Sequence, residues 1–135
     1  MWTWIRHLFG GGEGFPLPPS HLDIPTMESC AITPKELKEK MDRGDPVVLV
    51  DVREAFELEQ AAIPGVRHIP MGEIHMRYKE ISSDPNAEVV VFCHHGSRSE
   101  QVMTQLWGLG YQNTKNLAGG IQAWSEEVDL SIPQY

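Results

Sequence analysis

The sequence predicts an α/β domain in which helices cover both faces of a parallel sheet. Two apolar runs, 47–52 and 89–92, have the composition of strands that are buried on both faces. Segments with helical spacing of apolar residues alternate with these runs, and turns rich in Gly and Pro separate them. This alternation is typical of a parallel sheet, and 135 residues suffice for one domain with a hydrophobic core.

The first predicted helix begins in the segment 33–36, which reads Thr-Pro-Lys-Glu. Threonine is a good N-cap, proline suits the first helical position, and glutamate at the third completes a capping box. Leu37 and Met41 are expected to face the core, and Gly44 is expected to end the helix. The turn that follows leads into the strand at 47–52.

Asp51 and Arg53 stand where the strand at 47–52 ends. Ligand sites of open α/β sheets lie beyond the C-terminal ends of the strands, so both residues are expected near the active edge of the sheet. A structural ion pair or a helix cap is the favoured interpretation, and direct catalysis is the alternative.

The middle of the chain contains shorter elements. Residues 53–59 permit a short helix, and 62–70 predicts a turn and a brief strand bounded by prolines. A weak helix is expected over 73–81, and a loop over 82–86. No Cys/His spacing resembles a zinc site, so no metal site is expected.

Residues 89–100 predict a strand, a tight loop and a helix. The apolar run ends at Cys93, a polar loop follows, and apolar residues then recur at helical spacing. Ser97 and Glu100 have the spacing of a capping box, so a helix start at Ser97 is expected.

The last predicted elements are a short strand at 113–117 and a helix that starts near residue 120. Gly119 and Gly120 lie between them. A flexible double glycine permits a sharp bend and lets the backbone approach the loop after Cys93 closely.

Cys93 is the candidate nucleophile. The thiolate is the reactive form of cysteine, and unpaired N–H groups at a helix start or in a curled loop stabilise an anion. Gly96 permits the backbone conformation that such a loop needs, and Arg98 adds a permanent positive charge. We therefore favour a reactive thiol over a buried, inert cysteine. The expected active loop consists of Cys93, His94, His95, Gly96, Ser97, Arg98 and Ser99.

The motif Cys-His-His-Gly-Ser-Arg-Ser at 93–99 resembles the active-site loop of rhodanese-type sulfurtransferases. The resemblance covers residues 27–135. The last eight residues are similar to the tail of small rhodanese domains, some of which are fused to ubiquitin-like-protein activating enzymes. Two further segments agree with the resemblance: 50–70 and 116–124.

The resemblance implies a rhodanese-like sheet of five parallel strands, with helices on both faces and the active loop at its centre. Cys93 would take a sulfur atom from a small anionic donor such as thiosulfate, hold it as a persulfide, and pass it to cyanide or a thiol. No metal or organic cofactor is required. His94 and His95 are expected either to add hydrogen-bond donors or to set specificity. Ala62 departs from the family, which often has histidine there, and this affects local packing more than the nucleophile.

Two alternative functions belong to other classes. In the first, Cys93 is a persulfide carrier that delivers sulfur to a partner protein. In the second, the chain is a cysteine-dependent phosphatase or arsenate reductase, whose usual loop has five residues between Cys and Arg. Only four residues separate Cys93 and Arg98, which disfavours the second alternative.

Composition restricts the partners and the compartment. The net charge of −8 argues against nucleic-acid binding. Two cysteines permit one disulfide, but reduced thiols in the cytoplasm are favoured, because a disulfide would consume the nucleophile, and no role is assigned to Cys30. Residues 1–26 are expected to form a flexible extension ahead of a domain at 27–135. A membrane or partner anchor in that extension is disfavoured, and no signal peptide is evident.

Overall fold

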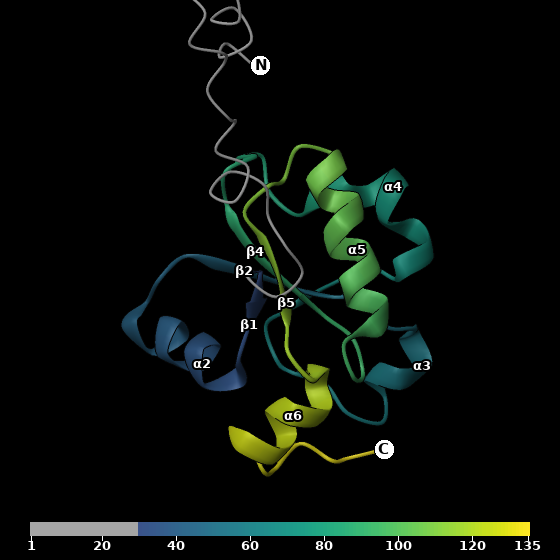
Figure 1. Cartoon of the computed structure of the whole chain (residues 1–135). Helices are drawn as coiled ribbons and strands as arrows, with labels where there is room; N and C mark the ends of the chain where they lie inside the picture. Colours follow the sequence, from purple (N-terminus) through teal and green to yellow (C-terminus); the bar gives the residue numbers. More distant parts are fainter. Residues whose placement is uncertain (1–29) are drawn as a thin grey trace, which may run out of the picture.

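The computed structural model describes residues 30–135, which contain a five-stranded, entirely parallel sheet (Figure 1). The strand order is β1-β5-β4-β2-β3, so β4 lies at the centre. This confirms the expected fold class. The extension at 1–26 and the expected domain start at residue 27 lie outside the described residues. The strands are β1 (Ala31–Ile32), β2 (Val47–Asp51), β3 (Arg67–His68), β4 (Glu88–Phe92) and β5 (Thr114–Leu117).

Helices cover both faces of the sheet, as alternate residues of β4 show. Val89 and Val91 belong to a core cluster with residues of α4 and α5, whereas Val90 and Phe92 belong to a cluster with residues of α2 and α6. Because both faces are covered, every residue of the strand except the first is buried. The helices are α2 (Pro34–Arg43), α3 (Ala55–Leu58), α4 (Ile74–Arg77), α5 (Ser97–Gly108) and α6 (Gly120–Glu127), with 3₁₀ turns η2 (Met71–Glu73) and η3 (Tyr78–Glu80).

The boundaries of α2 follow its local sequence. Thr33 and Glu36 form the predicted capping box, and Gly44 adopts a left-handed conformation with φ of 80°. The prediction that Met41 faces the core is wrong, since its side chain is 39% exposed. The buried residues of α2 are Pro34 and Leu37, so the second half of the helix extends past the core.

The weak helix expected over 73–81 is broken. It consists of η2, a single turn of α4 and η3, because Arg77 has φ of −120° and ψ of 4°, which are not helical values. The longest described helix is α5 with 12 residues. Within residues 30–135, no helix combines the length and the apolar character needed to cross a membrane.

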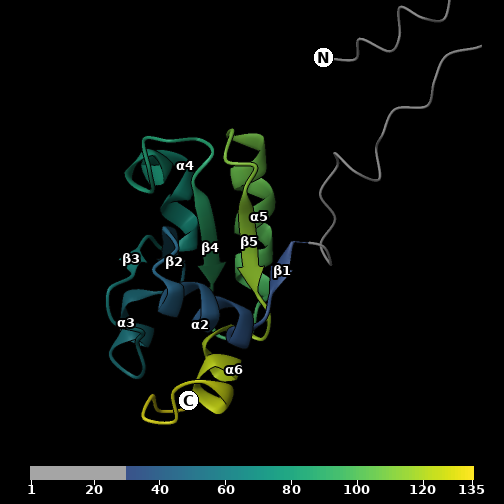
Figure 2. The ribbon, with the colours of Figure 1, turned by 90° about the vertical axis from the view of Figure 1, so that its left-hand side faces the viewer.

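The parallel arrangement places the C-terminal ends of the strands at one edge. Figure 2 shows the arrowheads of β4 and β5 at this edge, close to α6. The register pairs Asp51 at the end of β2 with Phe92 at the end of β4. Cys93 follows Phe92 directly, so the candidate nucleophile lies beside the end of β2, as expected.

Candidate active site

The loop that carries Cys93 joins the central strand to α5. Gly96 is the N-cap of α5 and has φ of 123°, a conformation that side-chain-bearing residues rarely adopt. The predicted helix start at Ser97 is confirmed, but the capping box of Ser97 and Glu100 does not form. Ser97 is the first helical residue, one position too late for a cap, and the Glu100 amide donates to the Gly96 carbonyl oxygen over 3.1 Å.

The Cys93 sulfur is buried and receives hydrogen bonds from the loop. The thiol side chain is 1% exposed, the Gly96 amide donates to Sγ over 3.1 Å, and the Ser99 hydroxyl lies 3.4 Å from Sγ. Burial raises the pKa of the Cys93 thiol, but the Ser99 hydroxyl and the amides of Ser99, Gly96 and Arg98 outweigh burial, so the pKa is lowered overall. The loop therefore stabilises a thiolate.

Asn116 on β5 fixes the orientation of Ser99. The Ser99 hydroxyl lies 2.6 Å from Asn116 Oδ1, and Asn116 Nδ2 donates to the Gly96 carbonyl oxygen over 3.1 Å. A hydroxyl has one hydrogen, so a Ser99 that donates to Asn116 presents a lone pair to the protonated thiol, and it can rotate to donate to the thiolate. Asn116 is not among the site residues predicted from the sequence. The feature that could have identified Asn116 is an amide side chain in the middle of a strand, because an unpaired polar group is costly when the strand is buried.

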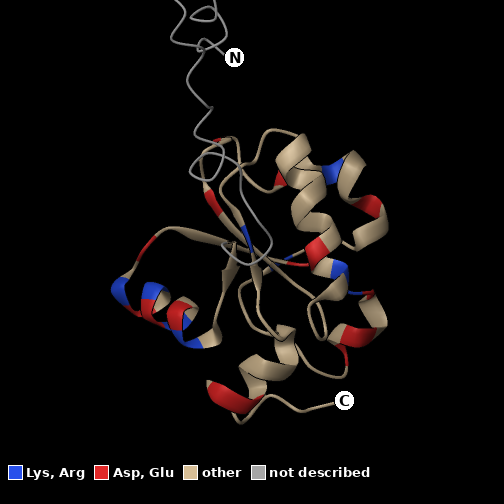
Figure 3. Cartoon of the chain, in the orientation of Figure 1, with Lys and Arg blue, Asp and Glu red and all other residues tan. Residues whose placement is uncertain are grey.

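Arg98 is held by an acidic residue that is also not among the site residues predicted from the sequence. Its guanidinium forms two hydrogen bonds to Glu57 of α3, with Nη1–Oε1 and Nη2–Oε2 distances of 2.6 and 2.9 Å. Figure 3 shows the basic start of α5 beside α3, the helix that contains Glu57. The hydrogen bonds from Arg98, opposed by burial, lower the pKa of Glu57 to about 2. Nothing in the sequence distinguishes Glu57 from Glu54 and Glu59 in the same acidic segment.

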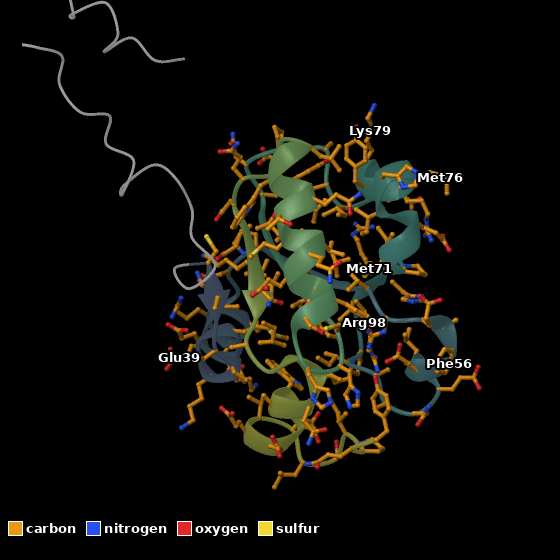
Figure 4. All side chains as sticks on the ribbon, turned by 45° about the vertical axis from the view of Figure 1, so that its right-hand side comes forward. Glu39, Phe56, Met71, Met76, Lys79 and Arg98 are labelled. Atoms are coloured by element: carbon orange, nitrogen blue, oxygen red, sulfur yellow. The ribbon has the colours of Figure 1, made fainter. Side chains whose placement is uncertain are left out.

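Figure 4 shows Arg98 near the first turn of α5, below Met71 and to the left of Phe56. The Arg98 side chain is one third exposed. Its charge is therefore accessible from solvent while it is paired with the buried Glu57 carboxylate. In this geometry Arg98 anchors the start of α5 to α3, and the local positive potential is smaller than the sequence alone suggests.

Asp51 and Arg53 form a fully buried ion pair at the same edge of the sheet. Arg53 Nη2 lies 2.7 Å from Asp51 Oδ2, and both side chains are inaccessible to solvent. The Arg53 guanidinium also donates to the carbonyl oxygens of Glu57 and Ala61. These bonds attach β2 to α3 and its following turn, which is a structural role.

The two histidines of the loop differ in their surroundings. The His94 ring stacks on Tyr135, with centroids 3.9 Å apart and an interplanar angle of 4°, and it also contacts the His95 ring. Burial and then the neighbouring His95 lower the pKa of His94, so His94 is neutral at pH 7. His95 is exposed.

The double glycine brings α6 against the active loop, as predicted. The amides of Ile121 and Gln122 donate to the carbonyl oxygens of Cys93 and His94, over 2.9 and 3.1 Å. A Cβ on Gly120 would lie 2.6 Å from the Cys93 carbonyl oxygen. Only glycine fits at this position, where φ is also 62°.

A thiolate-stabilising loop at the end of a central parallel strand defines a cysteine-dependent group-transfer site. The chain belongs to the rhodanese family, because the family model of the rhodanese-like domain matches residues 33–127. The chain is 37% identical over 102 residues to the putative sulfurtransferase YtwF of Bacillus subtilis, covering 76% of this chain and 96% of YtwF. It is thus a single rhodanese-like domain and a homologue of single-domain sulfurtransferases.

Two further similarities extend this assignment. The chain is 35% identical over 98 residues to the putative sulfur carrier protein YrkF of Bacillus subtilis, covering 73% of this chain and 52% of YrkF. It therefore spans only about half the length of that relative. The crystal structure of a rhodanese-like domain protein from Staphylococcus aureus has a TM-score of 0.66 and 31% identity, covering 78% of this chain and 97% of that one. The relatives of this rhodanese-like domain thus include a putative sulfurtransferase and a putative sulfur carrier.

Proposed function

We propose that the protein transfers sulfane sulfur through a persulfide on Cys93. The Cys93 thiolate attacks the outer sulfur of a donor such as thiosulfate. The donor S–S bond breaks, sulfite leaves with the bonding electron pair, and Cys93 becomes a persulfide. A nucleophile such as cyanide or a thiol then attacks the outer sulfur, and the Cys93 thiolate leaves.

The observation that carries the proposal is the set of hydrogen bonds directed at one buried sulfur atom. The Gly96 amide and the Ser99 hydroxyl stabilise negative charge on Sγ, which is both the attacking atom and the leaving group. No proton has to be removed when the thiolate is already populated, so the neutral His94 need not act as a base.

The carrier function is the second candidate, and the similarity to YrkF favours it. The site chemistry is the same, but the acceptor is a partner protein. In contrast, the phosphatase alternative is disfavoured, because both Nη atoms of Arg98 are engaged by Glu57 rather than available for an oxyanion.

The test combines turnover with sulfur loading. A thiosulfate:cyanide assay is run on the native chain and on Cys93→Ser, and intact mass is measured after thiosulfate alone. Turnover, together with a mass gain of one sulfur (about 32 Da) that the variant lacks, supports the proposed enzyme. Loading without turnover supports the carrier. If the native chain shows no sulfur loading and no turnover, with either thiosulfate or an alkyl persulfide as donor, the proposal is contradicted.

A further inference from the structure

Tyr135 connects two charged groups beside the active loop. Its hydroxyl oxygen accepts a hydrogen bond from Arg53 Nη1 over 2.8 Å, and its hydroxyl group lies 2.8 Å from Glu57 Oε2. An arginine can only donate, so the tyrosine proton is directed at the Glu57 carboxylate. That carboxylate holds Arg98, and the hydroxyl therefore stabilises the ion pair that anchors the start of α5.

The ring of the same residue supports the other side of the loop. It lies parallel to the His94 ring at 3.9 Å, and His94 is the residue next to the nucleophile. Tyr135 thus contacts the loop directly at His94 and indirectly at Arg98, which enclose the residues that turn back over the Cys93 sulfur.

The segment that carries Tyr135 is fixed by its own contacts with α6. The buried Ser125 hydroxyl donates to the Ile132 carbonyl oxygen over 2.6 Å, and the Ile132 side chain is only 6% exposed. The Gln122 side chain also donates to Gln134 over 3.0 Å. These contacts fix the position of the residues that precede Tyr135, and the Tyr135 ring therefore stacks on His94 from a fixed position.

We propose that Tyr135 is a positioning residue for the active loop. Its hydroxyl holds Glu57 on Arg98 and its ring braces His94, and together they keep the Gly96 amide and the Ser99 hydroxyl directed at the Cys93 sulfur. The inference rests on the proposed function in one respect, namely that Cys93 is the reactive group. It can still be tested on the thiol alone, without any sulfur donor.

The experiment measures how fast iodoacetamide alkylates Cys93 between pH 5 and 9, with the Cys93 peptide followed by mass spectrometry so that Cys30 does not interfere. Tyr135→Phe removes the hydroxyl and keeps the ring, and Tyr135→Leu removes both. The matched control is Tyr111→Phe, which also loses one hydroxyl hydrogen bond, a 2.7 Å bond to the Ser82 carbonyl oxygen. Thermal unfolding is recorded for every variant, and alkylation is measured well below each midpoint.

We expect the pH profile of Tyr135→Phe to move to higher pH, so that alkylation at pH 6 slows about threefold, and that of Tyr135→Leu to move further, to about tenfold. Tyr111→Phe loses stability but keeps the native profile. Native profiles for both Tyr135 variants, or an equal displacement in Tyr111→Phe, overturn the inference. A displaced profile in a protein that takes up no sulfur overturns the proposed function and leaves the positioning role standing.

Discussion

A buried thiol is ordinarily harder to ionise than an exposed one, yet the pKa of Cys93 lies below its usual value. The loop resolves the conflict by replacing water with fixed donors. The Gly96 amide is held by the backbone conformation, and the Ser99 oxygen is held near the sulfur by Asn116, so the thiolate needs only a rotation of the hydroxyl hydrogen. The same donors serve the thiolate at the beginning and at the end of a sulfur-transfer cycle.

Ser99→Ala tests the contribution of the hydroxyl at the scale of one residue. Since the hydroxyl is the largest of the influences that lower the pKa of Cys93, its removal raises that pKa. Alkylation of Cys93 at pH 7 is expected to slow about three- to tenfold, while the rate at pH 10 stays native. The control is Ser97→Ala, two residues earlier and exposed. Equal rates for the two variants at pH 7 would contradict the assignment.

Asn116→Ala tests the support behind Ser99. The substitution leaves the Ser99 hydroxyl without its shortest partner in a buried site and removes a donor from the Gly96 carbonyl. The free energy of unfolding, measured by urea denaturation, is expected to fall by about 1–3 kcal/mol. Asn113→Ala, at an exposed position just before the same strand, is expected to change it by less than about 0.5 kcal/mol. A small loss in both variants would show that the Asn116 amide is not needed.

At the scale of elements, the contact between α6 and the active loop depends on one glycine. Gly120→Ala places a methyl group against the Cys93 carbonyl oxygen and also strains a positive φ. The contact is with backbone, which cannot move aside, so we expect a loss of about 2 kcal/mol or more in unfolding free energy and a parallel loss of sulfur loading. Both are measured on the purified variant, by urea denaturation and by intact mass.

Gly108→Ala is the matched control for that prediction. Gly108 lies at the end of α5, and a Cβ there meets no atom within 4 Å. Alanine favours a helix over glycine by up to about 1 kcal/mol, so this variant is expected to be as stable as the native chain or slightly more stable. A loss as large as that of Gly120→Ala would mean that the close approach is not the cause.

Elements that are specified by their own residues could be predicted from the sequence. The α2 cap lies within four consecutive residues, and the strand ends at 51 and 92 follow from apolar runs. In contrast, neither the exposure of Met41 nor the breaks within 71–80 could be predicted from the local sequence. Such features are set by tertiary packing, which a local pattern does not contain.

The same distinction separates the parts of the site. The contiguous residues of the loop were recognisable because their chemistry lies in one short segment. Glu57 and Asn116 come from α3 and β5, and each looks like an ordinary polar residue until the fold places it beside Arg98 or Ser99. Their burial gives them their role, and burial is a property of the folded chain.

At the scale of the whole molecule, charge is arranged in pairs around the site. Arg53 is paired with Asp51 and Arg98 with Glu57, so the active edge carries little uncompensated charge on a chain whose net charge is −8. Removing one member of the fully buried Asp51–Arg53 pair costs more than the pair itself contributes, because the other charge is left unsatisfied, whereas Arg98 is one third exposed. The ion pairs therefore make the stability of the domain sensitive to acid.

Glu57 gives that sensitivity a definite pH window. Its pKa falls from 4.5 to about 2 on folding, so the native state binds its proton less readily than the unfolded state does. The associated stability is fully present above pH 4.5 and is lost as the pH falls through 2. A difference of this size corresponds to about 3 kcal/mol. Urea denaturation from pH 6 to pH 2 should therefore show the native chain losing about 3 kcal/mol more than Glu57→Gln, which has no carboxylate to protonate.

The control for this prediction is Glu59→Gln, which removes the same charge from an exposed position at the end of α3. It is expected to follow the native chain throughout the acid range. At pH 6, Glu57→Gln should already be the less stable variant, because Arg98 then lacks its counter-ion. The native chain and Glu57→Gln should converge as the pH approaches 2. Parallel curves for these two proteins would show that the Glu57–Arg98 pair is not what makes the fold acid-sensitive, whereas convergence would tie the stability of the whole domain to the residue that anchors its active loop.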